Sequence, residues 1–441
     1  MVNTVISRFS ELFLEKIKHS KLLVISHFDT DGITSAAIIS KTLGRLEKQF
    51  SLRIIKGMDD EAILSIPKEV LVIITDLGSG SLEKLGIMKN EFLIIDHHEI
   101  SGEVPNNVTI INPFLEKELD NLCSAELTYL VSSSISDENK DLAYLAVIGM
   151  VGDLMENNIN KTRNQIIKDA NVIVKKGLLI YPSTRPLDKS LEYSSSLFIP
   201  GVTGNQRGVY ELLKEVGIER IGKIYKSLID LNEKEMKDLV TAIMLRMNIR
   251  EKPKEYVGNL YLIKFFNKIE DAREISAMIN SCSRLGESNV ALTLCMGNPE
   301  SRKKAERIYV KYRQHIISAL KYVDKNKIAT DNYVIINGKD KIKDTIIGTI
   351  ASIISFSHVY KEGTIIIGMA YNENRIKIST RIAGRTQNSH NLRELMNYVT
   401  ALLGGESGGH KQAAGCTIKR EDEQRFLEII KRKLEFELVK V

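Results

Sequence analysis

Short, almost continuously apolar runs alternate with segments of helical periodicity over about the first 115 residues of this 441-residue chain. Such runs, rich in Ile, Leu and Val, are typical of strands buried on both faces of a parallel sheet. The segments between them, such as Ile33–Lys48, provide the helical crossovers that parallel strands require. The predicted strands are Leu22–Ser26, Leu52–Lys56, Val70–Thr75, Phe92–Ile95 and Val108–Asn112. The alternation therefore predicts an N-terminal doubly wound α/β domain.

The rest of the chain divides into three further parts. From about Asp331 onward, predicted strands again alternate with helical segments, which predicts a second, smaller α/β domain. Its predicted strands are Tyr333–Ile336, Thr364–Met369 and Arg375–Ser379. We therefore predict an N-terminal domain over residues 1–165, a largely helical middle region over 166–300, a basic connecting helix over 301–330 and the C-terminal domain over 331–441.

The composition favours a soluble, cytoplasmic protein without a membrane partner. The longest uncharged apolar stretch, Thr345–Tyr360, is shorter and more polar than the run of about 20 apolar residues that crosses a bilayer. The beginning of the sequence has no pattern of a secretory signal. The four cysteines are widely scattered, which favours reduced core residues over a disulfide scaffold or a zinc site.

The net charge of +6 is concentrated in one segment. Between Ser301 and Thr330, nine basic residues stand against two acidic ones. The segment has helical periodicity, with an apolar stripe on one face and Lys303, Arg307 and Lys311 one turn apart on another. This basic face is either an ordinary solvated helix surface or a track for the phosphates of a nucleic acid.

Acidic and imidazole side chains follow three of the predicted N-terminal strands. The carboxyl ends of parallel strands meet at one edge of a sheet, where ligands bind, so these side chains are expected to converge. Crowded carboxylates repel one another unless cations neutralise them, and mixed oxygen and nitrogen ligation favours manganese, with magnesium as the alternative. The residues are His27, Asp29 and Asp31 after the first strand, Asp76 after the third, Asp96, His97 and His98 after the fourth, and Asp153 beyond a later helix.

The order and spacing of these residues resemble the motifs of a known family. The run His27-x-Asp29-x-Asp31-Gly32, the isolated Asp76, the triplet Asp96-His97-His98 and Asp153 resemble the four motifs of the DHH phosphoesterase superfamily. The segment Gly404–Gly415 is similar to the glycine-rich, histidine-containing motif of the DHH-associated domain of RecJ-like nucleases, from whose commonest form it departs at Glu406-Ser407. The segments Phe198–Gly204 and Asn280–Gly286 look like parts of archaeal RecJ-type proteins.

The resemblance implies a two-metal active site with two Mn²⁺ or Mg²⁺ ions. The implied ligands are His27 and Asp29 for one ion, Asp31, His97 and Asp153 for the other, and Asp76 as the bridge between them. The implied catalytic pair is Asp96, which would orient a ligand histidine, and His98, which would face the scissile phosphate. Together these groups would activate water for attack on a phosphodiester.

The C-terminal motif predicts a phosphate-binding site. Glycines such as Gly408 and Gly409 allow backbone N–H groups to approach a phosphate closely, and His410 adds a polar donor. Arg381 and Arg385 stand where a guanidinium could clamp a nucleotide phosphate. We expect these residues, with Lys303, Arg307 and Lys311, to bind the substrate.

The resemblance implies a RecJ-like exonuclease that acts on single-stranded DNA or RNA and releases 5′-nucleotides. One alternative is a phosphodiesterase for oligoribonucleotides or cyclic dinucleotides, which carries similar motifs on a shorter chain. Another is a replisome scaffold related to RecJ, with a GINS-type partner. The long middle region and the basic segment favour a polymeric substrate, and the complete set of implied ligands favours activity over a purely structural role.

Overall fold

The computed structural model describes residues 2–437 apart from 195, 196, 198, 248–255, 358 and 385–390. The chain forms two compact units, which are described in turn. The first comprises residues 1–187, 220–236 and 253–309, and the second comprises residues 188–219, 237–252 and 310–441. The predicted domain boundaries at residues 165, 300 and 330 stay predictions. In the part of the chain just defined, no helix combines the length and apolar character that a membrane crossing needs.

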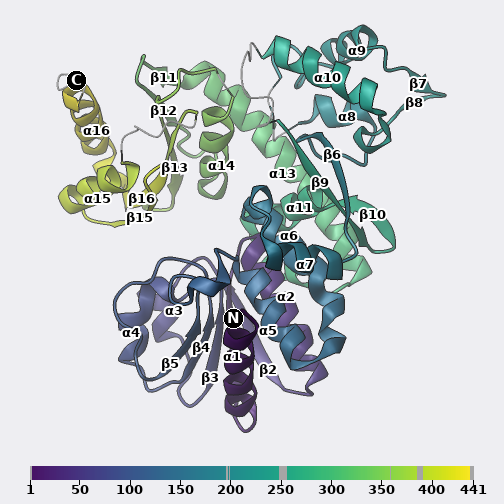
Figure 1. Ribbon diagram of the computed structural model, residues 1–441. Helices are drawn as coiled ribbons and strands as arrows, with labels where there is room; N and C mark the ends of the chain where they lie inside the picture. The colour runs from purple at the N-terminus through teal and green to yellow at the C-terminus, as the bar shows by residue number, and fades with distance from the viewer. Residues whose placement is uncertain are drawn as a thin grey trace. The chain divides into compact units, whose positions relative to one another are not determined.

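The first unit contains a five-stranded parallel sheet in the order β2-β1-β3-β4-β5 (Figure 1). Its strands are β1 (Leu22–His27), β2 (Phe50–Ile55), β3 (Leu71–Thr75), β4 (Phe92–Ile95) and β5 (Val108–Ile111). All of the strands predicted from the apolar runs are confirmed to within two residues at each end. The central strands β1, β3 and β4 could be predicted because strands buried on both faces need no polar positions, whereas the edge strand β2 alternates half-buried and exposed residues over most of its length.

Helices cover both faces of this sheet, as the doubly wound prediction requires. One face packs against α1 (Val2–Ile17), α2 (Thr30–Arg45) and α5 (Ser124–Ile135). Leu82 and Leu85 of α4 (Leu82–Gly86) pack against the other face, where α3 (Asp60–Leu64) precedes β3. Helix α2 begins earlier than the predicted Ile33 because the Asp29 side chain caps it, accepting a hydrogen bond of 3.1 Å from the Gly32 N–H.

The middle of the chain contains a sheet that the predicted largely helical region did not include. Strands β6 (Ile173–Leu178), β9 (Val257–Phe265) and β10 (Lys268–Asp271) form an antiparallel sheet in the order β10-β9-β6. Because β6 and β9 are far apart in the sequence, no local turn signal links them. The other elements here are α6 (Ala143–Gly152), α7 (Lys161–Asp169), α8 (Leu187–Glu192), α9 (Gln206–Glu215), the short strands β7 (Arg220–Ile221) and β8 (Ile224–Tyr225), and α10 (Glu233–Arg246).

Two helices after this sheet return to the N-terminal domain, and a long helix follows them. Helices α11 (Ala272–Arg284) and α12 (Ser288–Cys295) share a buried apolar cluster with α2 and α6. The basic segment forms the 28-residue helix α13 (Pro299–Asn326). The predicted apolar stripe on α13 is buried at Tyr312, Ile316, Ala319 and Val323 and partly buried at Ile308, and the predicted basic face is exposed.

The second unit contains a six-stranded mixed sheet in the order β11-β12-β13-β14-β16-β15. Its strands are β11 (Ile328–Ala329), β12 (Tyr333–Asn337), β13 (Ile365–Asn372), β14 (Arg375–Ile382), β15 (Glu406–His410) and β16 (Ala413–Lys419). Helix α14 (Asp344–Ser355) packs on one face, and α15 (Leu392–Leu403) and α16 (Glu423–Glu437) pack on the other. The mixed α/β fold class predicted from the sequence is confirmed, whereas β15 and β16 were not predicted as strands.

Candidate metal centre

The carboxyl edge of the parallel sheet brings the predicted acidic and imidazole side chains together. His27 ends β1, Asp76 follows β3, and the triplet Asp96–His98 follows β4. Three groups of these residues each place one donor atom per residue within 4.8 Å of the others. The groups are His27, Asp29 and Asp76; Asp31, His97 and Asp153; and Asp76, His97 and His98. Asp76 and His97 each belong to two groups, so the groups form one continuous cluster.

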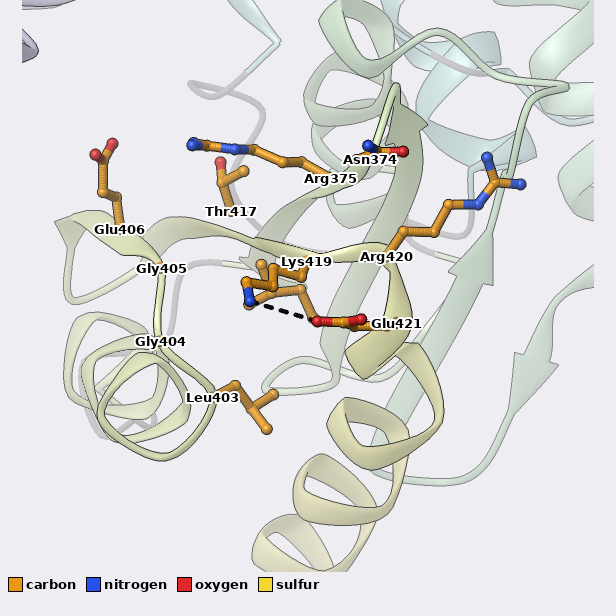
Figure 2. A pocket seen from close by; sticks show the side chains of 11 residues that line it. Asn374, Arg375, Leu403, Gly404, Gly405, Glu406, Thr417, Lys419, Arg420 and Glu421 are labelled. Atoms are coloured by element: carbon orange, nitrogen blue, oxygen red, sulfur yellow. Dashed lines mark ion pairs between the residues drawn. The ribbon is translucent and has the colours of Figure 1, made fainter.

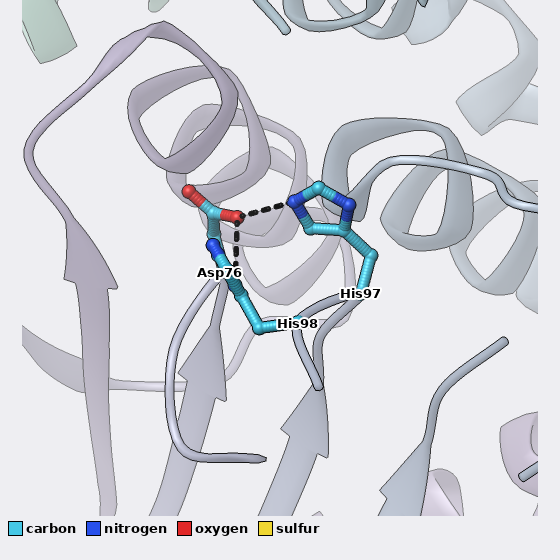
Figure 3. Close-up of side chains that lie close together, drawn as sticks. All are labelled: Asp76, His97 and His98. Carbon is cyan, nitrogen blue, oxygen red and sulfur yellow. Dashed lines mark ion pairs between the residues drawn. The ribbon is translucent and has the colours of Figure 1, made fainter. Parts of the chain in front are cut away.

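Asp76 lies at the centre of this cluster (Figure 3). Its Oδ2 atom is 3.2 Å from His27 Nδ1, and its Oδ1 atom is 3.5 Å from His97 Nε2 and 3.9 Å from His98 Nδ1. The latter two distances are too long for hydrogen bonds, and Oδ1 is a buried carboxylate oxygen with no hydrogen-bond partner among the described residues. A buried anionic oxygen facing two imidazoles provides the position that a shared cation would occupy, so the donor set fits a metal.

The backbone holds Asp76 in an unusual conformation. Its φ of 60° is in the left-handed region, which few non-glycine residues adopt. The Asp76 N–H donates a hydrogen bond of 2.9 Å to the Ile95 carbonyl, which anchors the residue to the neighbouring strand β4. Such a conformation persists where surrounding contacts fix it. At Asp76 it directs the carboxylate into the cluster.

Asp31 is held by a helix terminus. Its Oδ2 and Oδ1 atoms accept hydrogen bonds of 2.8 and 2.9 Å from the N–H groups of Ser124 and Ala125, at the start of α5. A Cβ on Gly149 would lie 2.8 Å from Asp31 Oδ1, so glycine leaves the space that this carboxylate needs. This support was not predicted from the sequence, although Glu126 in the first turn of α5, which accepts a hydrogen bond of 2.9 Å from the Cys123 N–H, is one mark of a helix start.

Asp96 lies outside the three groups and acts on its neighbours. Its Oδ1 atom accepts a hydrogen bond of 2.8 Å from His98 Nδ1 and another of 2.8 Å from the His97 N–H. Its Oδ2 atom accepts one of 3.0 Å from the Ser79 N–H. The fully buried carboxylate therefore fixes the ring of His98, whose side chain is 46% exposed and accessible to a substrate.

The charges of the cluster shift the pKa of several members strongly. Burial would lower the pKa of His97, but the nearby carboxylates of Asp76, Asp31 and Asp153 raise that pKa to about 10. Burial raises the pKa of Asp153 to about 7, with Asp76 adding to the shift and His97 opposing it. Burial also raises the pKa of Asp31 well above its usual range. Without metal the cluster thus holds protons, which a divalent cation would displace.

The glycine-rich motif forms an edge hairpin rather than a loop. Gly408, Gly409 and His410 lie in β15, which pairs only with β16 in the described sheet. In register, His410 stands opposite Ala413, and Ala413 stands opposite Arg381 of β14. His410 and Arg381 therefore share one row and one face of the sheet. Arg385 lies outside the described residues.

Arg381 is oriented by its own unit. Its Nε atom donates a hydrogen bond of 3.0 Å to Ser352 Oγ on α14, and its Nη1 atom donates one of 2.8 Å to the Thr380 carbonyl.

A cavity of about 910 Å³ lies at the other end of the hairpin of β15 and β16 (Figure 2). It was not predicted, and it adds Arg375, Lys419 and Arg420 to the cationic side chains of this domain.

The three basic residues predicted on α13 are all exposed. Lys303 forms an ion pair of 3.0 Å with Glu300. Neither Arg307 nor Lys311 has an ion pair among the residues described. The helix therefore presents them to solvent with their spacing of one turn, as the sequence indicated.

Family models match three parts of the chain. The model of the DHH family N-terminal domain matches residues 21–150, that of the DHH-CID domain matches residues 180–261, and that of the DHHA1 domain matches residues 330–435. The chain belongs to the DHH superfamily. Within it, the chain is similar to RecJ, in line with the predicted resemblance.

Two curated proteins are similar to this chain. An uncharacterized protein of Methanocaldococcus jannaschii is 27% identical over 440 residues, which cover 96% of this chain and 95% of that protein. The single-stranded-DNA-specific exonuclease RecJ of Bacillus subtilis is 28% identical over 156 residues, which cover 31% of this chain but only 20% of RecJ.

Two solved structures share the fold. RecJ from Thermus thermophilus in complex with Mn²⁺ superposes with a TM-score of 0.62 at 16% identity, covering 98% of this chain and 55% of that chain. CDC45 from Entamoeba histolytica superposes with a TM-score of 0.67 at 12% identity, covering 96% and 98% respectively. At these identities the likeness shows the fold alone, and one fold includes both a nuclease and CDC45.

The hairpin geometry predicts different tolerances for two adjacent glycines. At Gly409, φ is 123° and a Cβ would lie 2.4 Å from the Ala413 carbonyl oxygen, whereas a Cβ on Gly408 would meet nothing within 4 Å. Gly409→Ala should therefore lower the free energy of unfolding of the C-terminal domain by about 1–3 kcal/mol. Gly408→Ala, the control, should change it by less than about 0.5 kcal/mol. Differential scanning calorimetry of the two variants measures these changes. Equal effects of the two variants would contradict the hairpin register.

Proposed function

We propose that this chain is a metal-dependent phosphodiesterase that hydrolyses single-stranded nucleic acid, as an exonuclease releasing 5′-nucleotides. The observation that carries the proposal is the joining of the three donor groups into one cluster around Asp76 and His97, in which the buried Asp76 Oδ1 atom has no partner among the described residues. Similarity to a single-stranded-DNA-specific exonuclease supports the substrate class. RecJ structures from Thermus thermophilus hold Mn²⁺ or Mg²⁺, which supports the cofactor.

In this proposal the cluster holds two divalent cations. His27 and Asp29 would hold one, and the other would be held by the group of Asp31, His97 and Asp153, with Asp76 shared between them. Bound there, the cations would acidify a water molecule and stabilise charge on the phosphorus oxygens. The mixture of carboxylate and imidazole donors makes Mn²⁺ the first candidate and Mg²⁺ the second.

The chain's own residues would position the substrate phosphate. Burial lowers the pKa of His98, but its hydrogen bond to Asp96 and the charges of Asp96 and Asp76 together outweigh burial and raise that pKa overall. With Nδ1 donating to Asp96, the Nε2 atom of the ring is free to donate to a phosphate oxygen. Asp96 would thus serve to hold the His98 ring in the orientation that this contact needs.

The C-terminal domain would bind the nucleic-acid backbone. Arg381 is oriented by Ser352 and the Thr380 carbonyl, and His410 stands in the same row of the sheet. A guanidinium and an imidazole on one face form a suitable surface for a phosphate group. The exposed Lys303, Arg307 and Lys311 would extend the contacts to a longer strand.

A replisome scaffold is the second candidate. The fold likeness to CDC45 over 98% of that chain favours it, and a GINS-type protein would be the corresponding partner. The complete set of donor residues favours the enzyme, because a scaffold has no need of buried acids and imidazoles at one point. The two roles are compatible in one molecule, and hydrolysis of a labelled strand separates an active protein from a purely structural one.

Replacing Asp76 tests the metal centre. Asp76→Asn keeps the shape of the side chain, and asparagine tolerates the left-handed backbone, but it removes the charge shared by two donor groups. Turnover of end-labelled single-stranded DNA and RNA with Mn²⁺ should fall at least ~10³-fold. Excess EDTA should abolish turnover of the unaltered protein, and added Mn²⁺ should restore it.

The control for this test is Asp137→Asn, which alters an aspartate that is 87% exposed and outside the cluster. It should leave turnover unchanged. A folded Asp76→Asn protein that keeps most of its activity, or activity that persists in chelator, would show that the cluster is not the catalytic centre.

The C-terminal phosphate site is tested separately from the metals. His410→Ala and Arg381→Ala should each slow cleavage of single strands, because each removes a phosphate contact. Bound Mn²⁺, counted after equilibrium dialysis, should stay the same, because the donor groups belong to the other unit. Loss of Mn²⁺ from either variant would assign the residue to the metal site or to the fold.

The basic helix is tested by the salt dependence of binding. If Lys303, Arg307 and Lys311 each neutralise a phosphate, replacing all three with alanine should make the log–log slope of affinity against salt shallower by about two units. Cleavage of a dinucleotide should change little, because it makes no such contacts.

A matched control removes the same charge elsewhere. Lys21, Lys68 and Lys89 are exposed and precede β1, β3 and β4, at the edge of the sheet opposite the cluster. Their replacement by alanine should leave the slope unchanged. Equal slopes for the two triple variants would make the helix face an ordinary solvated surface.

A further inference from the structure

Helix α11 contacts the loop that carries two of the cluster's acids. Thr30 stands between Asp29 and Asp31 and is 1% exposed. Its Oγ1 atom donates a hydrogen bond of 3.0 Å to the carbonyl oxygen of Ser276 in α11. The Ser276 hydroxyl lies 3.3 Å from the same Thr30 oxygen. A residue 246 positions further along the chain therefore fixes the start of α2.

The same helix also contacts the segment that carries Asp153. A Cβ on Gly152 would lie 2.7 Å from Thr30 Cβ and 3.3 Å from Ser276 Oγ, so these three residues pack directly against one another. One turn earlier in α11, Arg273 Nη2 donates a hydrogen bond of 3.1 Å to Glu156 Oε1. Glu156 follows Asp153 by three residues and is 7% exposed. Helix α11 thus holds both flanks of the group formed by Asp31, His97 and Asp153.

Arg273 links this contact to the antiparallel sheet of the first unit. Its Nη1 atom donates a hydrogen bond of 3.0 Å to the carbonyl oxygen of Asn259 in β9. The planar guanidinium spans two acceptors, one on the sheet and one on the loop after Asp153. A shift of β9 therefore moves the loop that carries a candidate ligand.

We propose that α11 is a positioning element of the metal centre, and that Thr30 and Arg273 are positioning residues through which the β10-β9-β6 sheet sets the separation of Asp31 and Asp153. The proposal rests on the proposed function in taking this group to hold a metal. Its physical reason is that the donors come from separate elements, so metal affinity depends on how rigidly those elements are held.

The first test removes the Thr30 hydroxyl. Thr30→Val should weaken binding of one of the two Mn²⁺ ions by about tenfold, measured by titration of the free Mn²⁺ signal in electron paramagnetic resonance. Thr30→Ser keeps the donor and should restore the affinity. The control, Thr42→Val, removes a fully buried hydroxyl from the same helix, where among the described residues it bonds only the Ile38 carbonyl at 2.9 Å. It should match the loss of thermal stability of Thr30→Val without the loss of Mn²⁺ affinity.

A second variant keeps the test independent of the fold at Thr30. Arg273→Lys keeps the positive charge beside Glu156 but cannot span both acceptors. Its Mn²⁺ affinity should lie between those of the unaltered protein and Thr30→Val. Unchanged Mn²⁺ affinity in folded Thr30→Val or Arg273→Lys would overturn the proposal, as would an equal loss in Thr42→Val.

These outcomes are distinguishable from failure of the proposed function. If the unaltered protein binds two Mn²⁺ ions but cleaves no strand, the proposed function fails, and the pattern of affinities still supports the role of α11. If strands are cleaved and Thr30→Val binds Mn²⁺ normally, only the role of α11 fails. If the unaltered protein binds no Mn²⁺, both fail.

Discussion

The buried carboxylate of Asp76 is the constraint on which the rest of the site depends. Burial would raise its pKa, but the hydrogen bond from His27 and the nearby imidazole of His97 hold that pKa well below the usual range. An anion with this little solvent persists only because its partners approach it from separate strands. The parallel sheet provides that approach, because all of its strands end at the same edge. The fold thus brings His27 and His97, which are distant in the sequence, close enough to compensate the negative charge of Asp76.

Other parts of the first unit compensate the charges around Asp76. The first N–H groups of α5 hold Asp31, and Asp96 holds His98. Helix α5 is itself anchored, because Glu126 in its first turn pairs with the fully buried Arg163 of α7. Removing either partner of such a pair leaves a buried charge uncompensated. The acids of the cluster are therefore held by a chain of contacts that extends from the strand ends to α7.

The sequence predicted the elements whose signal is local. The strands β1, β3 and β4 are near-continuous apolar runs, so each could be recognised from its own residues. Convergence of His27, Asp76 and His97 followed from topology, since parallel strands have one carboxyl edge. The hairpin of β15 and β16 was not recognised, because four glycines between Gly404 and Gly409 mask the alternation of a strand. The pairing of β6 with β9 was missed because it spans a long separation in sequence, whereas β9 and β10 form a local hairpin that was also not recognised.

The supports of the cluster could not be predicted for a different reason. The contacts of Asp31 with α5 and of Thr30 with α11 join residues 93 and 246 positions apart. The supporting residues, Ser124 and Ser276, are uncharged and belong to no metal-binding motif. Backbone N–H and carbonyl groups make these bonds, and every residue type carries a carbonyl. A pattern of side chains can therefore reveal the donors of a metal site, whereas the groups that hold those donors become visible only once the backbone is placed.

The energetic cost of the cluster favours the enzyme over the scaffold. Burial raises the pKa of Asp31 and Asp153, which means that folding disfavours the ionised form of both side chains. Apolar residues of similar size at the same positions would remove that cost, since replacing buried ionic groups by well-packed apolar ones is often neutral or stabilising. A protein that used this fold only as a surface for partners would gain nothing from the acids. A divalent cation instead turns their mutual repulsion into ligation, and that makes the same arrangement favourable.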